Sequence, residues 1–206
     1  LDLLRGIGIF PSYKDRELLF HIPQHSERAM KSFIRSPYIL VHPVSRWMFK
    51  CCTPQLIAQV IDYLFRQGER IIITASSDPE EKRYIQKIIS LLPSSERIID
   101  CSGKITLKEL GVIVRATKLL ISIDSLPIHL ASVFKTPLVA IFGPTSEQRW
   151  GPWQHPLFEI VSQPLPCRPC YRPGCAGSFK SDCLLTLSAS SIIDAIQKVQ
   201  NRSINS

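Results

Sequence analysis

The chain has 206 residues, of which 45% are hydrophobic and 20% charged, as in an ordinary globular domain. Its longest apolar runs are too short to span a bilayer, and no stretch resembles a signal peptide. The net charge of +8 favours an anionic partner, such as a nucleotide, a phosphorylated glycolipid or a membrane surface, although a solvated basic surface would also explain it. The basic residues are scattered and no nucleic-acid-binding signature occurs, so we expect no nucleic-acid partner.

Residues 1–37 hold three prolines and little periodicity, which predicts an irregular segment. The first residue is Leu1 rather than Met, and it lies within a helical pattern. We therefore expect a piece of a larger protein, in which 1–37 is an interdomain connector or the remnant of an N-terminal domain. The predicted domain covers residues 38–206.

From Tyr38 onward, apolar strand patterns alternate with amphipathic helix patterns. Thr53 and Pro54 open one helix that Gly68 ends, and Thr106 with Glu109 has the capping-box pattern of another. We expect further helices over 79–91, 127–134 and 190–199, and strands over 38–42, 71–74, 97–99, 119–123, 138–142 and 158–161. Continuously apolar strands between helices predict an α/β, Rossmann-like parallel sheet with helices on both faces.

Open parallel sheets bind ligands at the carboxyl ends of their strands. Polar and charged residues gather in the loops that follow the predicted strands, at 42–50, 75–81, 101–104, 124–129 and 143–153. We therefore expect the functional site at this edge.

The loop after the first strand carries Ser45, Arg46, Trp47 and Lys50. A hydroxyl can donate to a phosphate oxygen, a lysine neutralises it, and an arginine binds it with two parallel N–H groups. The pattern predicts a phosphate site; the alternative is a basic surface loop with Trp47 packed beneath it.

After the fourth strand, Asp124 and Ser125 precede a helix that carries His129 near its first turn. Free N–H groups and the dipole make a helix N-terminus a natural anion site. We expect Asp124 and Ser125 to cap the helix and His129 to contact a phosphate or a ribose. Capping alone and a structural histidine are the alternatives.

The loop after the fifth strand holds Thr145, Arg149, Trp150 and Trp153. We expect Thr145 to contact the base or a phosphate and the other three to line a sugar or acceptor cleft, with a purely structural loop as the alternative. Glu80 and Glu81 begin the helix after the second strand, where acids also suit the helix dipole.

A Cys-rich segment over 163–187 has the spacing Cys167-x2-Cys170-x4-Cys175-x7-Cys183. Four thiolates could hold a structural zinc, but redox-labile pairs and unligated thiols remain alternatives, so we assign no metal site. No Asp-x-Asp pair, Walker loop or G-x-G-x-x-G is present, which argues against a catalytic divalent metal, an NTPase and a dehydrogenase.

The motif D-S-x-x-x-H-L-A at 124–131, followed by T-P-x-V-A-x-F-G-P-T at 136–145, resembles the C-terminal half of glycosyltransferase family 9, the ADP-heptose:lipopolysaccharide heptosyltransferases. These are two-domain enzymes of the GT-B type, and R-W-x-F-K-C at 46–51 is most similar to the heptosyltransferase III-like branch. The resemblance implies a nucleotide-sugar-binding domain whose Ser45 and Lys50 contact the diphosphate. It also implies that Glu81 binds the ribose, and it places Leu126 where the family has a small residue beside the diphosphate.

The implied reaction transfers heptose from ADP-heptose to the lipopolysaccharide inner core, with Lys50 stabilising the leaving diphosphate and no cofactor besides the donor. The implied location is the cytoplasm, with peripheral contact at the cytoplasmic face of the inner membrane. In the family the general base comes from the N-terminal domain, which we expect to be missing here. Two alternatives stay open: a non-catalytic remnant that binds nucleotide only, and a zinc-stabilised interaction module.

Overall fold

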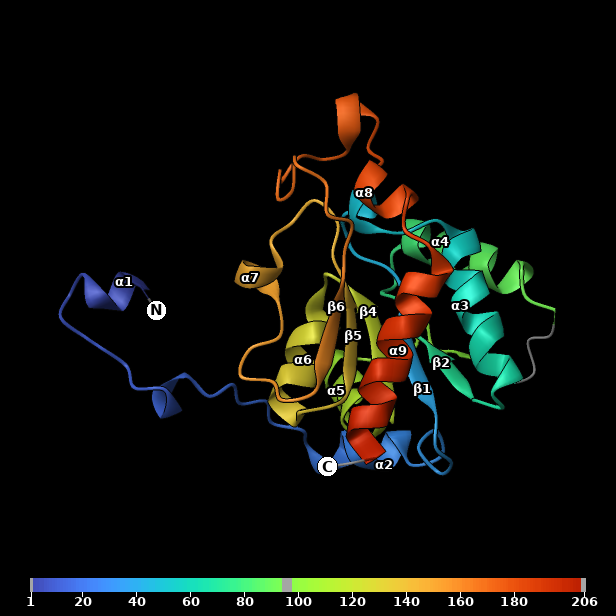
Figure 1. Ribbon diagram of the computed structural model, residues 1–206. Coiled ribbons are helices and arrows are strands. Elements are labelled where there is room, and N and C mark those ends of the chain that lie inside the picture. Colours follow the sequence, from blue (N-terminus) through green and yellow to red (C-terminus); the bar gives the residue numbers. More distant parts are fainter. Residues whose placement is uncertain (1, 94–97, 205–206) are drawn as a thin grey trace.

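The computed structural model describes residues 2–93 and 98–204. Its centre, within those residues, is a six-stranded sheet in which every neighbouring pair is parallel (Figure 1). The strand order is β3-β2-β1-β4-β5-β6. The strands are β1 (Ile39–His42), β2 (Ile71–Ile73), β3 (Ile98–Asp100), β4 (Leu119–Ile123), β5 (Leu138–Ile141) and β6 (Phe158–Val161).

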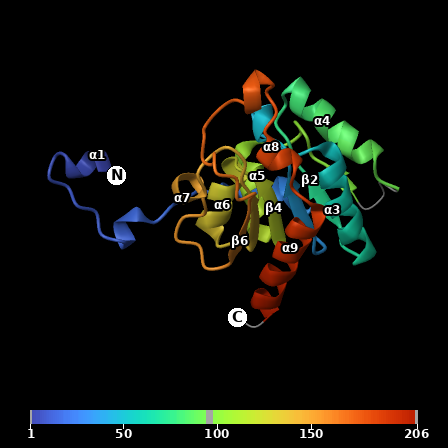
Figure 2. The same ribbon diagram turned by 45° about the horizontal axis from the view of Figure 1, so that its top comes forward.

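Helices cover both faces of the sheet (Figure 2). One face packs on α3 (Pro54–Arg66), α4 (Pro79–Ser90) and α9 (Ala189–Ile204). The other packs on α2 (Gln24–Met30), α5 (Leu107–Ala116) and α6 (Leu126–Phe134). Because side chains alternate along a strand, Val41 enters the first core and Leu40 the second.

The remaining helical elements are short. They are α1 (Asp2–Arg5), α7 (Glu147–Trp150), α8 (Asp182–Leu185) and the 3-10 turns η1 (Lys14–Arg16), η2 (Met48–Lys50) and η3 (Cys175–Gly177). Across the described ranges, no helix combines the length and apolar character that a membrane span requires.

Local signals start α3, α4 and α5 where the sequence predicts these helices. The Thr53 hydroxyl accepts a hydrogen bond from the Leu56 amide, and Thr106 and Glu109 form a reciprocal capping box. Asp78 caps α4 by accepting from the amides of Glu80 and Glu81. Gly68 ends α3 with a φ of 79°, a conformation that glycine adopts without steric cost.

The predicted fold class is confirmed, and the predicted strands agree with the observed ones to within a residue at each described end. Arg97, expected to begin the third strand, and Leu1 lie outside the described residues. The closing helix is longer than predicted, because α9 continues to Ile204.

The expectation that residues 1–37 are irregular is wrong for α2. No side chain caps this helix, so it lacks the local start signal that a sequence pattern would reveal. Its stability comes from tertiary contacts instead: Met30 is buried in the second core, and Glu27 pairs with Arg115 of α5 at 2.7 Å.

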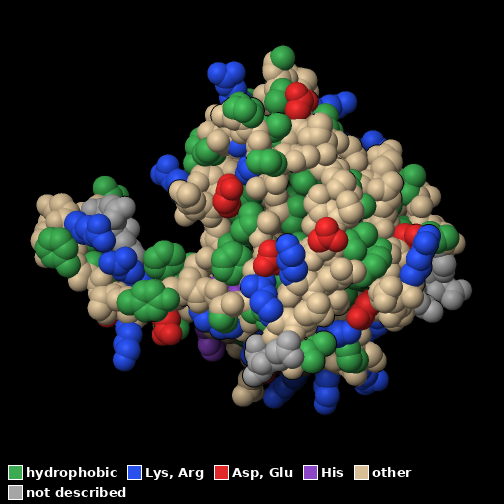
Figure 3. Space-filling view, viewed as in Figure 1, with side chains coloured by type: hydrophobic (Ala, Val, Ile, Leu, Met, Phe, Trp, Pro, Cys, Tyr) green, Lys and Arg blue, Asp and Glu red, His purple; other side chains and the backbone are tan. Residues whose placement is uncertain are grey.

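Residues 2–23, which precede α2, form an N-terminal arm. The part of the arm nearest α2 contacts the domain, and the rest extends away from it (Figure 1). The Phe20 ring lies so close to Gly111 of α5 that a Cβ there would be 2.6 Å from it. The Trp153 indole donates to the Arg16 carbonyl, and the Gln154 amide to the Tyr13 carbonyl. Beyond these contacts the arm carries exposed apolar side chains away from the sheet (Figure 3): Leu3, Ile7, Phe10 and Tyr13.

Candidate functional site

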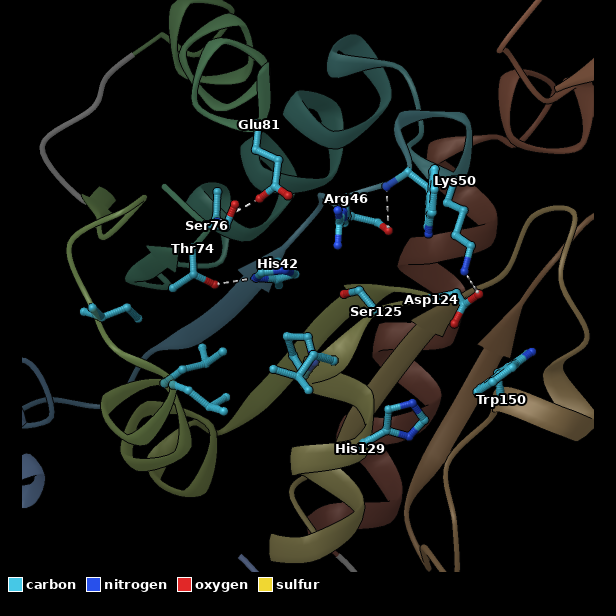
Figure 4. A pocket seen from close by; sticks show the side chains of 18 of the residues that line it. His42, Arg46, Lys50, Thr74, Ser76, Glu81, Asp124, Ser125, His129 and Trp150 are labelled. Atoms are coloured by element: carbon cyan, nitrogen blue, oxygen red, sulfur yellow. Dashed lines mark hydrogen bonds and ion pairs between the residues drawn. The ribbon is translucent and has the colours of Figure 1, made fainter. Parts of the chain in front are cut away.

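The order of the strands fixes where a ligand would bind. β1 and β4 are adjacent, and the chain leaves them toward opposite sides of the sheet, which makes their carboxyl ends a topological switch point. A cavity of about 670 Å³ opens there, within the usual size range of small-molecule sites (Figure 4). Its walls include His42, Ser45, Arg46, Trp47, Lys50, Thr74, Ser76, Glu81, Ile105, Leu107, Leu110, Asp124, Ser125, Leu126, His129 and Trp150.

One end of the cavity holds a buried ion pair. Lys50 Nζ lies 2.8 Å from Asp124 Oδ2, and the two side chains are 17% and 7% exposed. The Thr145 hydroxyl donates to the same carboxylate oxygen at 2.5 Å. Asp124 thus joins three loops, those after β1, β4 and β5.

The expected capping by Asp124 and Ser125 is wrong. Ser125 is the N-cap residue of α6, but its side chain makes no capping hydrogen bond, and the Asp124 carboxylate turns toward Lys50 instead. Asp124 can gain a charged partner across the loop, which stabilises it more than a neutral amide donor would. Leu126, the first residue of α6, is half exposed at the cavity wall.

Two histidines line the cavity. His42, at the end of β1, forms a 2.9 Å hydrogen bond with the Thr74 hydroxyl, and burial lowers its pKa to about 4. Burial also lowers the pKa of His129, while the nearby Asp124 charge opposes that shift. Both rings are therefore neutral at physiological pH.

The other end of the cavity is more apolar. Ile105, Leu107 and Leu110 form a wall there. Glu81 lies on the same side, 6% exposed, and accepts a 2.8 Å hydrogen bond from the Ser76 amide (Figure 4). The sequence interpretation missed this wall because helix periodicity explains the leucines as ordinary core residues, and only the fold brings them to the cavity that Glu81 also lines.

The loop after β1 lies open along the cavity. Ser45 is buried and accepts from the Trp47 amide at 3.2 Å, while Arg46 is exposed on the wall. Trp47 is 57% exposed, with its ring 6.0 Å from that of Phe49, so the alternative in which it packs beneath the loop is wrong.

The residues of the loop after β5 take different places in the structure, and only some of them line the cavity. Trp150 lines the cavity, and the Arg149 guanidinium lies 5.8 Å from its ring. Trp153 instead bonds the N-terminal arm, and Thr145 touches Asp124 without being part of the described cavity wall. The geometry brings Ser45, Arg46, Lys50, Glu81, Asp124, Ser125, Leu126 and His129 to one cavity, and their roles in binding stay predictions.

The Cys-rich segment forms loops and the short helix α8 above the carboxyl ends of the strands (Figure 1). Cys183 is buried, Cys167 is exposed, and Cys170 and Cys175 are intermediate, all as free thiols. Among the described residues, no three histidine, cysteine or acidic side chains come together as metal ligands. Burial raises the pKa of Cys51 to about 12 and those of Cys101 and Cys183 to about 11, so these thiols are protonated at neutral pH.

A model of glycosyltransferase family 9 (heptosyltransferase) matches residues 12–179, and the chain therefore belongs to this family. Among curated proteins, lipopolysaccharide heptosyltransferase 3 of Escherichia coli K12 is 26% identical over 174 residues, which are 82% of this chain and 50% of that protein. The chain thus spans about half the length of this relative.

Two solved structures share the fold. The glycosyltransferase of family 9 from Veillonella parvula superposes with a TM-score of 0.76 at 20% identity, covering 98% of this chain and 58% of the other. The ADP-heptose lipopolysaccharide heptosyltransferase II of E. coli gives a TM-score of 0.73 at 16% identity, covering 91% and 54%. At these identities the likeness concerns the fold alone.

Proposed function

We propose that this chain is the donor-binding half of a GT-B heptosyltransferase and binds ADP-heptose in the cavity between β1 and β4. The observation that carries the proposal is the division of that cavity. Lys50 and the N-terminus of α6 offer positive groups at one end, while Glu81 and an apolar wall lie at the other. A nucleoside diphosphate has the matching order of groups: an apolar base, a ribose diol and two phosphates.

Each part of the donor has a proposed partner. The adenine would pack on Ile105, Leu107 and Leu110, and the buried Glu81 would accept from the ribose hydroxyls. The diphosphate would reach Lys50, Ser45 and Arg46, with His129 and the amides of α6 beside it. Thr145 would act through Asp124, because its hydroxyl is bonded to that carboxylate.

In the proposed transfer, the bond between the sugar's anomeric carbon and the diphosphate oxygen breaks, and an acceptor hydroxyl bonds to that carbon. Negative charge then grows on the leaving ADP, where the Lys50 ammonium and the α6 dipole would stabilise it. We propose no cofactor besides the donor. The base that takes the acceptor proton would belong to the N-terminal domain of a complete enzyme.

The N-terminal arm supports the idea of a second domain. Leu3, Ile7 and Phe10 are each more than 70% exposed, a cluster that water-facing segments seldom carry. We propose that residues 1–37 connect the donor-binding domain to a first domain that binds the lipopolysaccharide inner-core acceptor. The nucleotide-binding remnant is the second candidate, favoured by the half-exposed Leu126 side chain beside the diphosphate position.

We further propose a cytoplasmic location with peripheral contact to an anionic membrane surface. The outer turn of the Cys-rich segment presents exposed Tyr171, Arg172, Phe179 and Lys180, and aromatic and basic side chains are favoured at lipid headgroups. Co-sedimentation with vesicles of anionic and of neutral phospholipid tests this contact. Binding to the anionic vesicles only, lost in Phe179→Ser with Lys180→Ser, is expected; equal behaviour of both vesicles would contradict it.

A donor competition experiment tests the main proposal. The thermal midpoint of the purified chain is measured with ADP-heptose, with a UDP-sugar and without ligand, and ADP release is followed after addition of lipopolysaccharide that lacks only the heptose to be transferred. We expect stabilisation by ADP-heptose alone, with no ADP release in the absence of the other domain. Equal stabilisation by the UDP-sugar would remove the adenine assignment, and no stabilisation by either would remove the donor site.

A further inference from the structure

The Cys-rich segment, residues 163–187, holds two loops of the candidate site at once. Its contacts to the loop after β5 begin with Arg168, whose side chain is only 6% exposed. The Arg168 guanidinium donates to the Gly143 carbonyl at 2.5 Å, to the Gln163 carbonyl at 3.0 Å and to Glu147 Oε2 at 3.1 Å. Because the guanidinium is planar and rigid, it can donate to all three acceptors only in one orientation. It therefore holds the backbone at Gly143 and Gln163 in place.

Further contacts close the same junction. The amides of Cys170 and Tyr171 both donate to the Pro144 carbonyl, at 3.0 and 2.9 Å. The buried Leu184 side chain packs on Gly143 so closely that a Cβ there would lie 2.6 Å from it. Thr145, which bonds Asp124, directly follows these anchored residues.

The second loop is held from the other side. The buried Ser181 hydroxyl donates to the Phe49 carbonyl at 2.7 Å, one residue before Lys50. The contacts therefore form a closed circuit. It runs from the Cys-rich segment through the β5 loop to Thr145 and Asp124, then through Lys50 and its 3-10 turn back to the Cys-rich segment.

We infer that Arg168 and Ser181 are positioning residues of the diphosphate site. Ser181 sets the place of Lys50, and Arg168 sets the place of Thr145, and both act on the Asp124 carboxylate between them. This inference rests on the proposed donor site. Neither residue lines the cavity, so neither touches the donor, and the part of the cavity assigned to the nucleoside lies outside the circuit.

The test compares ligands that differ in phosphate. Binding of ADP and of adenosine is measured by calorimetry for the wild type, Ser181→Ala, Ser181→Thr and Arg168→Ala, with Arg66→Ala as the control for loss of an arginine that is 77% exposed and has no proposed role. We expect Ser181→Ala to weaken ADP binding roughly fivefold and Arg168→Ala about tenfold or more, as expected for losing neutral and charge-assisted hydrogen bonds. Adenosine binding should stay within about twofold, and Ser181→Thr and Arg66→Ala should match the wild type.

Amide hydrogen exchange provides a readout that needs no ligand. Ser181→Ala should raise exchange in peptides covering 44–52, and Arg168→Ala in those covering 143–150, with little change in α3. Should Arg168→Ala fail to fold, Ser181→Ala decides alone. Unchanged exchange, or equal weakening of ADP and adenosine, overturns the inference. A wild type that binds no ADP overturns the proposed donor site instead. Amide hydrogen exchange then still tests whether Ser181 and Arg168 hold the two loops in place.

Discussion

The side chains at the two ends of the cavity make different interactions. At the charged end, Lys50 and Asp124 already neutralise each other, and Thr145 adds a hydrogen bond. At the end that we assign to the nucleoside, Glu81 accepts from the Ser76 amide, and an apolar wall lines the same cavity. In the proposed complex a phosphate would displace an existing partner of Lys50, whereas a base would only remove water from apolar surface. We therefore expect most of the binding free energy to come from the nucleoside end. The replacement of Asp124 by a phosphate as the partner of Lys50 should distinguish ligands that carry a diphosphate from those that do not.

The largest effect should follow from removing the carboxylate at the charged end. Asp124→Asn leaves the poorly exposed Lys50 without its counter-ion, and we expect the free energy of unfolding to fall by about 2–4 kcal/mol. ADP should nevertheless bind more tightly than to the wild type, because no internal anion then competes for Lys50. Urea unfolding and calorimetry measure the two effects; weaker ADP binding in a folded Asp124→Asn would show that the pair does not compete with the diphosphate.

His42, between the two ends, gives a pH dependence (Figure 4). Because burial lowers its folded-state pKa to about 4, the unfolded chain binds more protons between about pH 6.5 and pH 4. Stability contributed by the neutral ring is therefore complete above pH 6.5 and falls as the pH drops through this window, by at most about 3 kcal/mol.

The urea midpoint of the wild type and of His42→Asn, followed from pH 7.5 to 4, checks this expectation. The variant should lose less stability on acidification than the wild type. Parallel curves would mean that the ring keeps an ordinary pKa. His129 and His155, whose pKa values burial also lowers, remain in both proteins and so cancel in the comparison.

The smallest effect is expected at the nucleoside end. Leu107 is 48% exposed on the cavity wall, so Leu107→Ala should change stability little. It should weaken ADP, AMP and adenosine by the same factor, about fivefold, because each loses the same apolar contact. Fluorescence or calorimetric titration of the three ligands measures this factor. A loss confined to ADP would place the phosphates, not the base, beside Leu107.

Local signals made most of the fold predictable. Each of these signals depends on residues that are close together in the sequence: the helix caps at Thr53 and Thr106, and the apolar strands. The parallel sheet follows from the alternation of strands and helices. The polar loops at the strand ends likewise predicted where the cavity lies. Helix α2 was not predictable, because it has no cap and depends on contacts with α5.

The partners within the site were beyond the sequence. Asp124 looked like a capping residue because a short-range pattern cannot reveal a lysine 74 positions away. The contact from Ser181 to Phe49 spans 132 positions, so the sequence left metal ligands, redox-labile pairs and unligated thiols as alternatives for the Cys-rich segment and did not reveal its contacts with the site. Such contacts become visible only when the order of the strands in the sheet is known, because that order decides which loops lie next to each other.

The most direct measurement is a calorimetric titration of the wild type and Lys50→Ala with ADP and with AMP. The account predicts that the wild type binds ADP at least about tenfold more tightly than AMP, since one charge-assisted contact to the second phosphate contributes about 1.5–3 kcal/mol. Lys50→Ala should lose most of that difference and keep its AMP affinity. Equal binding of ADP and AMP by the wild type, or an equal loss of both in Lys50→Ala, would contradict a diphosphate site at Lys50.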